Sequence, residues 1–242
     1  MRQKPLSLAA GVLVPLAFAH QTAMPQEDEE TPFTKDFPID QCYFVPAGGN
    51  PYFSLQPGRE TFLTDGDEEV RIVVTNDLKQ IEIDGRGHWS RVIEEHETEG
   101  GELVEVSRNY FSMCWPSMDV YYFGEDVDIY EEGEVVSHDG AWIAGENGAR
   151  PGLIMPQSAF LLGSRYYQEV APGVAEDRAE HVGTNLDLVV PAGSFEDCIE
   201  IEETTALEPG EVSIKRYCRD VGIVFDDGLE ASDIRRPWQG KR

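Results

Sequence analysis

The chain has 242 residues, of which 19 are Lys or Arg and 46 are Asp or Glu, so its formal net charge is −27. A protein that binds DNA or RNA must place cations on phosphates, so this excess of acidic residues excludes nucleic acid as a partner. Hydrophobic residues make up 40% of the chain, which is enough for a folded core and excludes an intrinsically disordered protein.

The N-terminal residues have the pattern of a secretory signal peptide. Arg2 and Lys4 precede an apolar run over residues 6–18, and the sequence Ala-Phe-Ala that ends at Ala19 is a typical cleavage site. The run is too short to span a bilayer, and we expect no transmembrane segment after cleavage. The sequence therefore predicts a signal peptide over residues 1–19 and a secreted protein in the periplasm or outside the cell.

The next segment, residues 20–36, is acidic and has no periodic pattern, so we predict that it is flexible. From residue 37 onward, β-branched and aromatic runs alternate with turn residues, as in antiparallel sheets. Asn76 and Asp77 predict a hairpin turn, and Gly100 and Gly101 predict another. The predicted strands are residues 69–75, 78–83, 89–95, 103–111, 120–123, 126–130, 134–137, 165–171, 178–183, 185–190, 195–204, 212–219 and 221–225.

Two segments depart from this pattern. Residues 139–163 are rich in Gly and Pro and predict a long loop, and residues 231–242 predict a basic C-terminal tail. No segment has the pattern of a long amphipathic helix. The predicted fold is therefore mainly β, with a single antiparallel half-barrel or sandwich domain over residues 37–230 and one long Gly/Pro-rich loop.

Four cysteines follow the predicted signal peptide: Cys42, Cys114, Cys198 and Cys218. An even number in an exported chain predicts two disulfide bonds, and their spacing does not match the CxxC pairs of a zinc site. If two neighbouring predicted strands pair so that Cys198 faces Cys218, Glu200 faces Arg216. This register suits a disulfide bond and a charge pair equally well.

Six motifs lie between residues 50 and 228: NPYFSLQPG at 50–58, YYFGEDVDIY at 121–130, ARPGLIMP at 149–156, YQEVAPGVAEDRAE at 167–180, VPAGSFEDC at 190–198 and LEPG at 207–210. Together they resemble the motifs of a family of exported, β-rich bacterial proteins of unassigned function. The resemblance implies a β-rich exported protein and no catalytic residue.

The same resemblance bears on the disulfide pairing. Members of the family tend to read Tyr-Tyr-Ala-Pro-Gly-Val-Gly where this chain has residues 217–222, so Cys218 is an added cysteine in that comparison. This implies that Cys218 pairs with Cys42 and that Cys114 pairs with Cys198. The strand register instead places Cys198 opposite Cys218, and the sequence leaves the connectivity open.

Charged and aromatic residues concentrate on both sides of Pro172 and Gly173, where residues 165–171 and 178–183 are expected to form a hairpin. Side chains from the two strands would then share one face. Its carboxylates could hold Ca²⁺ or act as acid and base in glycoside cleavage. The alternative is a solvated acidic face. The candidate ligand-binding residues are Tyr167, Glu169, Asp177, Arg178, Glu180 and, elsewhere in the chain, Trp142.

No common catalytic motif supports an enzyme: the sequence contains no Gly-x-Ser-x-Gly, no His-Glu-x-x-His and no phosphate-binding loop. A curved β sheet of this size commonly encloses an apolar cleft. We therefore expect a soluble, non-catalytic binding protein for an amphipathic small molecule or an envelope component. The alternatives are a carboxylate-dependent enzyme that acts on a glycan and a calcium-stabilised structural or interaction module.

Overall fold

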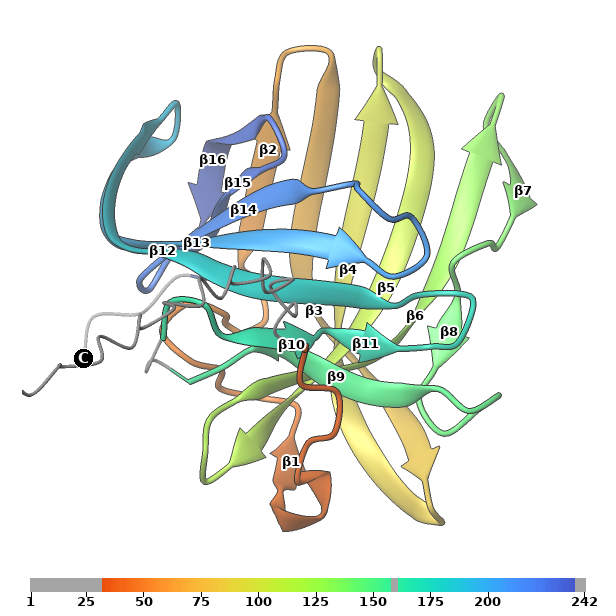
Figure 1. Ribbon diagram of the computed structural model, residues 1–242. Coiled ribbons are helices and arrows are strands. Elements are labelled where there is room, and N and C mark those ends of the chain that lie inside the picture. Colours follow the sequence, from red (N-terminus) through yellow and green to blue (C-terminus); the bar gives the residue numbers. More distant parts are fainter. Residues whose placement is uncertain (1–31, 158–160, 238–242) are drawn as a thin grey trace, which may run out of the picture. The chain divides into compact units, whose positions relative to one another are not determined.

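A computed structural model describes residues 32–157 and 161–237, so the predicted signal peptide and most of the predicted flexible segment lie outside the described residues. Within the described part, the structure is almost entirely antiparallel β, and its one helical element is the 3₁₀ turn η1 (Ile39–Gln41). Sixteen strands form one curved, nearly closed sheet (Figure 1). The predicted fold class is confirmed.

The strands in chain order are β1 (Tyr43–Val45), β2 (Glu60–Thr64), β3 (Glu68–Ile83), β4 (Arg86–Glu99), β5 (Glu102–Trp115), β6 (Val120–Glu131), β7 (Glu134–Ser137), β8 (Trp142–Ile143), β9 (Arg150–Met155), β10 (Arg165–Tyr167), β11 (Glu169–Val170), β12 (Asp177–Val190), β13 (Gly193–Thr205), β14 (Ser213–Cys218), β15 (Gly222–Asp226) and β16 (Leu229–Arg235).

Two meanders make up most of the sheet, β2 to β6 and β12 to β16, and each strand in them pairs with its neighbour in sequence. Strand β16 pairs with β2 and joins the two meanders, with Ala231 opposite Leu63. At the other side, β10 pairs with β12 while β11, directly after it, pairs with β9, which in turn pairs with β6. The short stretch 165–170 therefore bridges the two ends of the sheet.

A close backbone contact makes this bridge possible. Gly152 of β9 lies against the backbone of Gln168, and a Cβ atom on Gly152 would be 2.2 Å from the carbonyl oxygen of Gln168. Any other residue would push β9 and β11 apart. The Gly in the ARPGLIMP motif is thus required where the sheet changes partners.

Asn76 and Asp77 do not form the predicted hairpin turn, because β3 continues through them. The register between β3 and β4 shifts between Val74 and Leu78, which is a bulge in an unbroken strand. The buried guanidinium of Arg91 donates hydrogen bonds to the carbonyl oxygens of residues 75, 76 and 77, at 3.3, 3.0 and 3.4 Å. These bonds satisfy carbonyl groups that the bulge removes from the β ladder.

The expected boundaries also shift. Residues 139–163 contain β8 and β9 rather than a loop throughout, and residues 158–160 lie outside the described part. Strand β16 continues to Arg235 because it pairs with β2, so the domain extends past 230 into the predicted tail. At the other end, Thr34 of the predicted flexible segment hydrogen-bonds to β10, its N–H donating to the carbonyl of Arg165 at 2.9 Å. The domain therefore begins before residue 37.

Both predicted disulfide bonds are present, and all four cysteines are oxidised. Cys42 bonds to Cys114 because β1 lies antiparallel to β5, and Cys198 bonds to Cys218 across β13 and β14. The pairing that the resemblance implied is therefore wrong: Cys42 stands directly before β1, which pairs with the strand of Cys114, and Cys198 and Cys218 lie on adjacent strands. Two disulfide bonds indicate an oxidising compartment.

The register predicted around the second disulfide is confirmed. Glu200 of β13 lies opposite Arg216 of β14, and the Arg216 Nε atom donates to the Glu200 carboxylate at 2.6 Å. The disulfide and the ion pair thus coexist two residues apart on the same strand pair. Among the described residues, no helix is long and apolar enough to cross a membrane.

Candidate functional site

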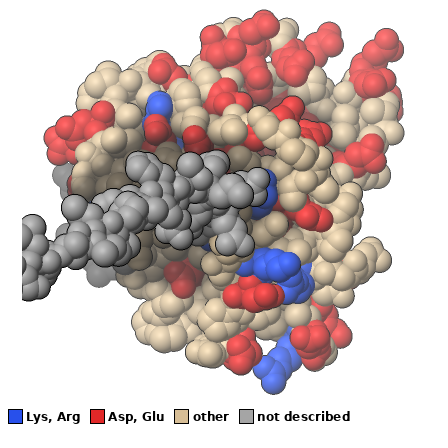
Figure 2. Space-filling view, in the orientation of Figure 1, with Lys and Arg blue, Asp and Glu red and all other residues tan. Residues whose placement is uncertain are grey.

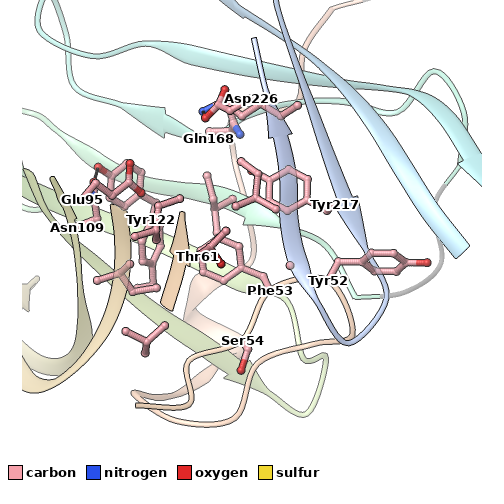
Figure 3. Close-up of a pocket in the computed structure, with 18 of the residues that line it drawn as sticks. Tyr52, Phe53, Ser54, Thr61, Glu95, Asn109, Tyr122, Gln168, Tyr217 and Asp226 are labelled. Atoms are coloured by element: carbon pink, nitrogen blue, oxygen red, sulfur yellow. Dashed lines mark hydrogen bonds and ion pairs between the residues drawn. The ribbon is translucent and has the colours of Figure 1, made fainter. Parts of the chain in front are cut away.

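The curved sheet encloses a cavity of about 260 Å³, lined by side chains from both meanders and from the segment before β2. In Figure 3, Phe53 lies near the middle of this space, with Tyr217 on one side and Tyr122 on the other. The ring of Phe111 stacks on Tyr122 at 4.7 Å and meets Phe53 edge-on at 4.9 Å between centroids. The apolar side of the cavity is therefore an aromatic wall with aliphatic side chains around it, which include Ile72, Val74, Ile93, Ile154 and Ile223.

The NPYF sequence before β2 positions Phe53. The Asn50 side-chain oxygen accepts hydrogen bonds from the N–H groups of Tyr52 and Phe53, both at 3.0 Å, which is the geometry of an Asx turn. The Asn50 amide donates to the carbonyl oxygens of Met155 and Pro156 at 3.1 and 3.2 Å. Asn50 thus ties this segment to the end of β9 and holds the Phe53 ring in the cavity.

Strand alternation places carboxyl groups in the same cavity. Ile93 of β4 faces inward, so Glu95, two residues later, faces inward as well. The register of β4, β5 and β6 aligns Ile93, Asn109 and Glu125 in one row across the sheet. The Tyr122 hydroxyl hydrogen-bonds to the Asn109 side-chain oxygen, and Figure 3 shows Glu95, Asn109 and Tyr122 together.

A half-buried lysine stands on the opposite wall. The Lys215 ammonium lies 3.2 Å from Glu203 and 3.3 Å from Asp226, and the Gln168 amide donates to Glu203 at 2.6 Å. Burial alone would lower the pKa of Lys215, but the carboxylates of Glu203 and Asp226 outweigh burial and hold that pKa well above its ordinary value. Lys215 is therefore charged and bound to two carboxylates.

The carboxyl groups of Glu95, Glu125 and Glu169 also face the cavity but have no cation bound to them. Burial raises the pKa of Glu95 to about 7 and the pKa of Glu125 to about 7. Burial, together with the nearby carboxyls of Asp177 and Glu125, raises the pKa of Glu169 well above its ordinary value. Among the described residues, no ion pair within 4.0 Å reaches Glu95, Glu125 or Glu169. Glu95 and Glu125 therefore take up protons near neutral pH, and burial disfavours the ionised form of Glu169.

Only some of the candidate residues named from the sequence lie at the cavity. Glu169 and Asp177 line the cavity, and the Glu169 carboxylate accepts the backbone N–H of Asp177 at 3.1 Å. Trp142 is buried and packs edge-on against Tyr122, at 5.2 Å between ring centroids. Tyr167, Arg178 and Glu180 are not among the cavity residues.

The expectation that Glu169, Arg178 and Glu180 share one face is wrong, because successive side chains of a strand alternate between faces. Ala179 is fully buried, so its neighbours Arg178 and Glu180 face outward. Glu180 binds Arg165 at 2.7 Å on that outer side. The predicted hairpin is confirmed for residues 165–167, which pair with β12, whereas residues 169–170 pair with β9 instead.

On the outer face, Arg178 holds the N-terminal segment. Its guanidinium carbon lies 4.7 Å from the ring centroid of Phe33, and that of Arg165 lies 5.1 Å from the same ring. The edge of the Tyr167 ring meets Phe33 at 6.3 Å. These contacts and the bonds of Thr34 to β10 attach the segment to the sheet.

Arg178→Ala is expected to loosen this attachment, because a partly buried cation–π contact contributes about 1–2 kcal/mol. Hydrogen exchange should become faster at the amides of Thr34 and Tyr167, which bond between the segment and β10. Arg178→Lys, which keeps a cation, should retain most of the protection. Unchanged exchange in Arg178→Ala would show that Arg178 does not hold the segment.

The calcium hypothesis has no defined site in the described part of the chain. No group of three or more His, Cys, Asp or Glu residues there has an arrangement that could hold a metal ion. The carboxyls of the cavity are spread over its walls, on β4, β6, β11, β12, β13 and β15, rather than gathered around one point.

Several cavity residues were missed from the sequence, among them Glu95, Glu125, Glu203, Lys215 and Asp226. The sequence does contain a signal for two of them. Glu95 is two residues from the apolar Ile93, and Lys215 is two residues from Tyr217, so strand alternation places each on the same face as an apolar neighbour. Comparison of the chain with models of protein families, with curated proteins and with solved structures gave no match. The resemblance to the exported family stays a prediction.

Proposed function

We propose that this chain is an exported binding protein whose cavity holds an amphipathic small molecule. The observation that carries the proposal is one cavity whose lining combines aromatic and aliphatic side chains with carboxyl, amide and ammonium groups. Pockets for small ligands are typically apolar with a few converging polar groups that fix orientation. Export is proposed from the signal-peptide pattern of residues 1–19, and two disulfide bonds support it.

The fold suits storage or transfer of such a molecule. The cavity is built on strands tied by hydrogen bonds over their length and by two disulfide bonds, so its walls are rigid. A preformed cavity loses little conformational entropy when a ligand enters. An apolar chain would lie against the aromatic wall, with its polar end among the carboxyl and amide groups.

The test uses three probes with the same apolar chain: 1-octanol, n-octylammonium and octanoate. Isothermal titration calorimetry should show that at least one of them binds with a stoichiometry of one. Val74→Phe places a larger side chain in the cavity, because Val74 is a cavity residue, and should weaken that binding at least about tenfold. Val73→Phe, on the outer face of the same strand, is the matched control and should bind as the wild type does.

Absence of binding by all three probes would contradict the proposed function, provided that thermal unfolding shows a folded protein. Equal weakening by Val73→Phe and Val74→Phe would place the binding site elsewhere.

A further inference from the structure

We propose that the ligand of this cavity carries a positively charged head group, held between Glu95 and Glu125 beside the aromatic wall. This inference rests on the proposed function and names the class of ligand, an organic cation with an apolar tail. Three independent features of the described residues support it: the balance of charge in the cavity, the position of the aromatic rings and the distribution of acidic groups at one end of the sheet.

The first feature is the balance of charge. Two cations, Lys215 and Arg59, line the cavity together with six carboxyl groups: Glu95, Glu125, Glu169, Asp177, Glu203 and Asp226. Lys215 binds Glu203 and Asp226, and Arg59 donates to the backbone carbonyls of Asp220 and Val221 at 3.0 and 2.8 Å. Both cations are therefore bound by other groups, and the Lys215 charge reaches Glu95 only as a longer-range interaction that lowers its pKa.

Glu95 and Glu125 are left facing the cavity. Neither makes an ion pair within the described part of the chain, and burial raises the pKa of both to about 7, although hydrogen bonds from Tyr122 and Trp142 partly offset it at Glu125. Buried carboxyls without a cation destabilise a fold, and a cation that enters the cavity would remove that penalty. An anionic ligand would meet repulsion at the same place, so the charge selects for a cation.

The second feature is the aromatic wall next to these carboxyls. Tyr122 is three residues before Glu125 on β6, and its ring stacks on Phe111. Aromatic faces attract ammonium groups electrostatically and also pack against alkyl chains. A protonated amine at Glu95 and Glu125 would thus have ring faces beside it and Ile93 and Ile154 available for its tail.

The third feature is an acidic approach. Glu97 of β4 lies opposite Glu105 of β5 and continues the inward row beyond Glu95 toward the β4–β5 hairpin. The neighbouring hairpin ends carry further exposed acids, among them Asp65, Asp67, Glu102, Glu131 and Glu132. Figure 2 shows Asp and Glu gathered over the upper part of the face in view. Such a field raises the local concentration of cations and repels anions.

Cation binding should release protons. Near pH 7 the carboxyls of Glu95 and Glu125 are partly protonated, and an ammonium group would favour their ionised form. The charged and titratable groups that act on these two carboxyls are Lys215, Asp226, Glu97, Glu105, Glu169, Asp177 and Tyr122. Because most of these are acids, the cavity has a strong tendency to hold protons when it holds no cation.

The experiment compares n-octylammonium with 1-octanol at pH 8 by calorimetry. The wild type should bind the ammonium at least about tenfold more tightly than the alcohol. The variant Glu95→Gln/Glu125→Gln should bind both probes to within about threefold of each other, with its affinity for 1-octanol retained. Glu94→Gln/Asp126→Asn, which changes the outward-facing neighbours on the same strands, should keep the wild-type preference.

A second readout reports the protons. Titration with n-octylammonium at pH 7 in two buffers of different protonation enthalpy should show net proton release in the wild type and less in Glu95→Gln/Glu125→Gln. Equal affinity of the wild type for the ammonium and the alcohol, with Val74→Phe still weakening both, would overturn the cationic head group and leave the proposed function intact. Tighter binding of octanoate would overturn it in the same way, and absence of all binding would contradict both proposals.

Discussion

Glu95→Gln is expected to unfold at a higher temperature than the wild type at pH 8 and at nearly the same temperature at pH 5. The wild-type carboxyl must be ionised inside the protein at pH 8, and burial opposes that ionisation. Glutamine has the same shape and carries no charge, so the penalty disappears. The expected sign is unusual, since removing a charged group stabilises the fold.

The pH window follows from the two pKa values. The ordinary value for Glu is 4.5, and burial raises the pKa of Glu95 to about 7 in the folded chain. A raised folded pKa means that the folded state binds the proton more tightly, so its stabilisation is complete below pH 4.5 and is lost as the pH rises through 7. One pKa unit corresponds to about 1.4 kcal/mol, which gives an upper value of about 3 kcal/mol for Glu95 at pH 8.

His181 changes the stability of the fold with pH in the opposite direction, and it does so in the acidic part of this pH range. Burial lowers the pKa of His181 to about 4, so protonation of the unfolded chain below pH 6.5 weakens the fold. This contribution is the same in the wild type and in Glu95→Gln, and the difference between the two proteins therefore isolates Glu95.

The measurement is the thermal midpoint of both proteins between pH 5 and pH 8. A gain of about 3–8 °C for Glu95→Gln at pH 8 corresponds to about 1–3 kcal/mol in a chain of this size. Glu94→Gln is the matched control, because Glu94 lies on the outer face 3.6 Å from Arg108 and should change the midpoint little. A pH-independent difference for Glu95→Gln would contradict the buried, proton-binding state of Glu95.

Removal of the Cys42–Cys114 disulfide is expected to lower the free energy of unfolding by about 4 kcal/mol, because the bond closes a loop with a sequence separation of 72. The Cys198–Cys218 bond closes a separation of 20, and its removal should cost about 3 kcal/mol. The longer loop loses more entropy in the unfolded chain when it is closed.

Urea denaturation of Cys42→Ala/Cys114→Ala and Cys198→Ala/Cys218→Ala, under identical non-reducing conditions, measures both values. The wild type alkylated without reductant should carry no label, since all four cysteines are bonded. The single variants are unsuitable because each leaves a reactive thiol. A larger loss from the short loop than from the long one would contradict the loop-entropy explanation.

The features that could be predicted from the sequence are those that depend on a local pattern of residues. The hairpin at Gly100 and Gly101, the pairing of β13 with β14 and the contact of Glu200 with Arg216 all follow from alternation and from turn residues. The break predicted at Asn76 failed because Arg91, from the neighbouring strand, satisfies the carbonyls of the bulge. No local pattern around Asn76 contains that information.

The candidate site was predicted only in part for a similar reason. Glu169 and Asp177 reach the cavity because residues 165–170 change partners between β12 and β9, and this switch depends on Gly152, which is distant in sequence. Glu125 reaches it through a register across three strands. A cavity is defined by side chains from many strands, so composition and spacing locate its members only after the strand order is known.

The junction of β16 with β2 has a consequence for how the molecule is made. It pairs Arg235 with Glu60, so the ring of strands cannot form until residues 60 to 235 are all present. Pairing between such distant residues is slow compared with formation of either meander. We therefore expect the acidic side chains of the interior to stay hydrated until β16 pairs with β2, and the free-energy cost of burying them to arise only in that step.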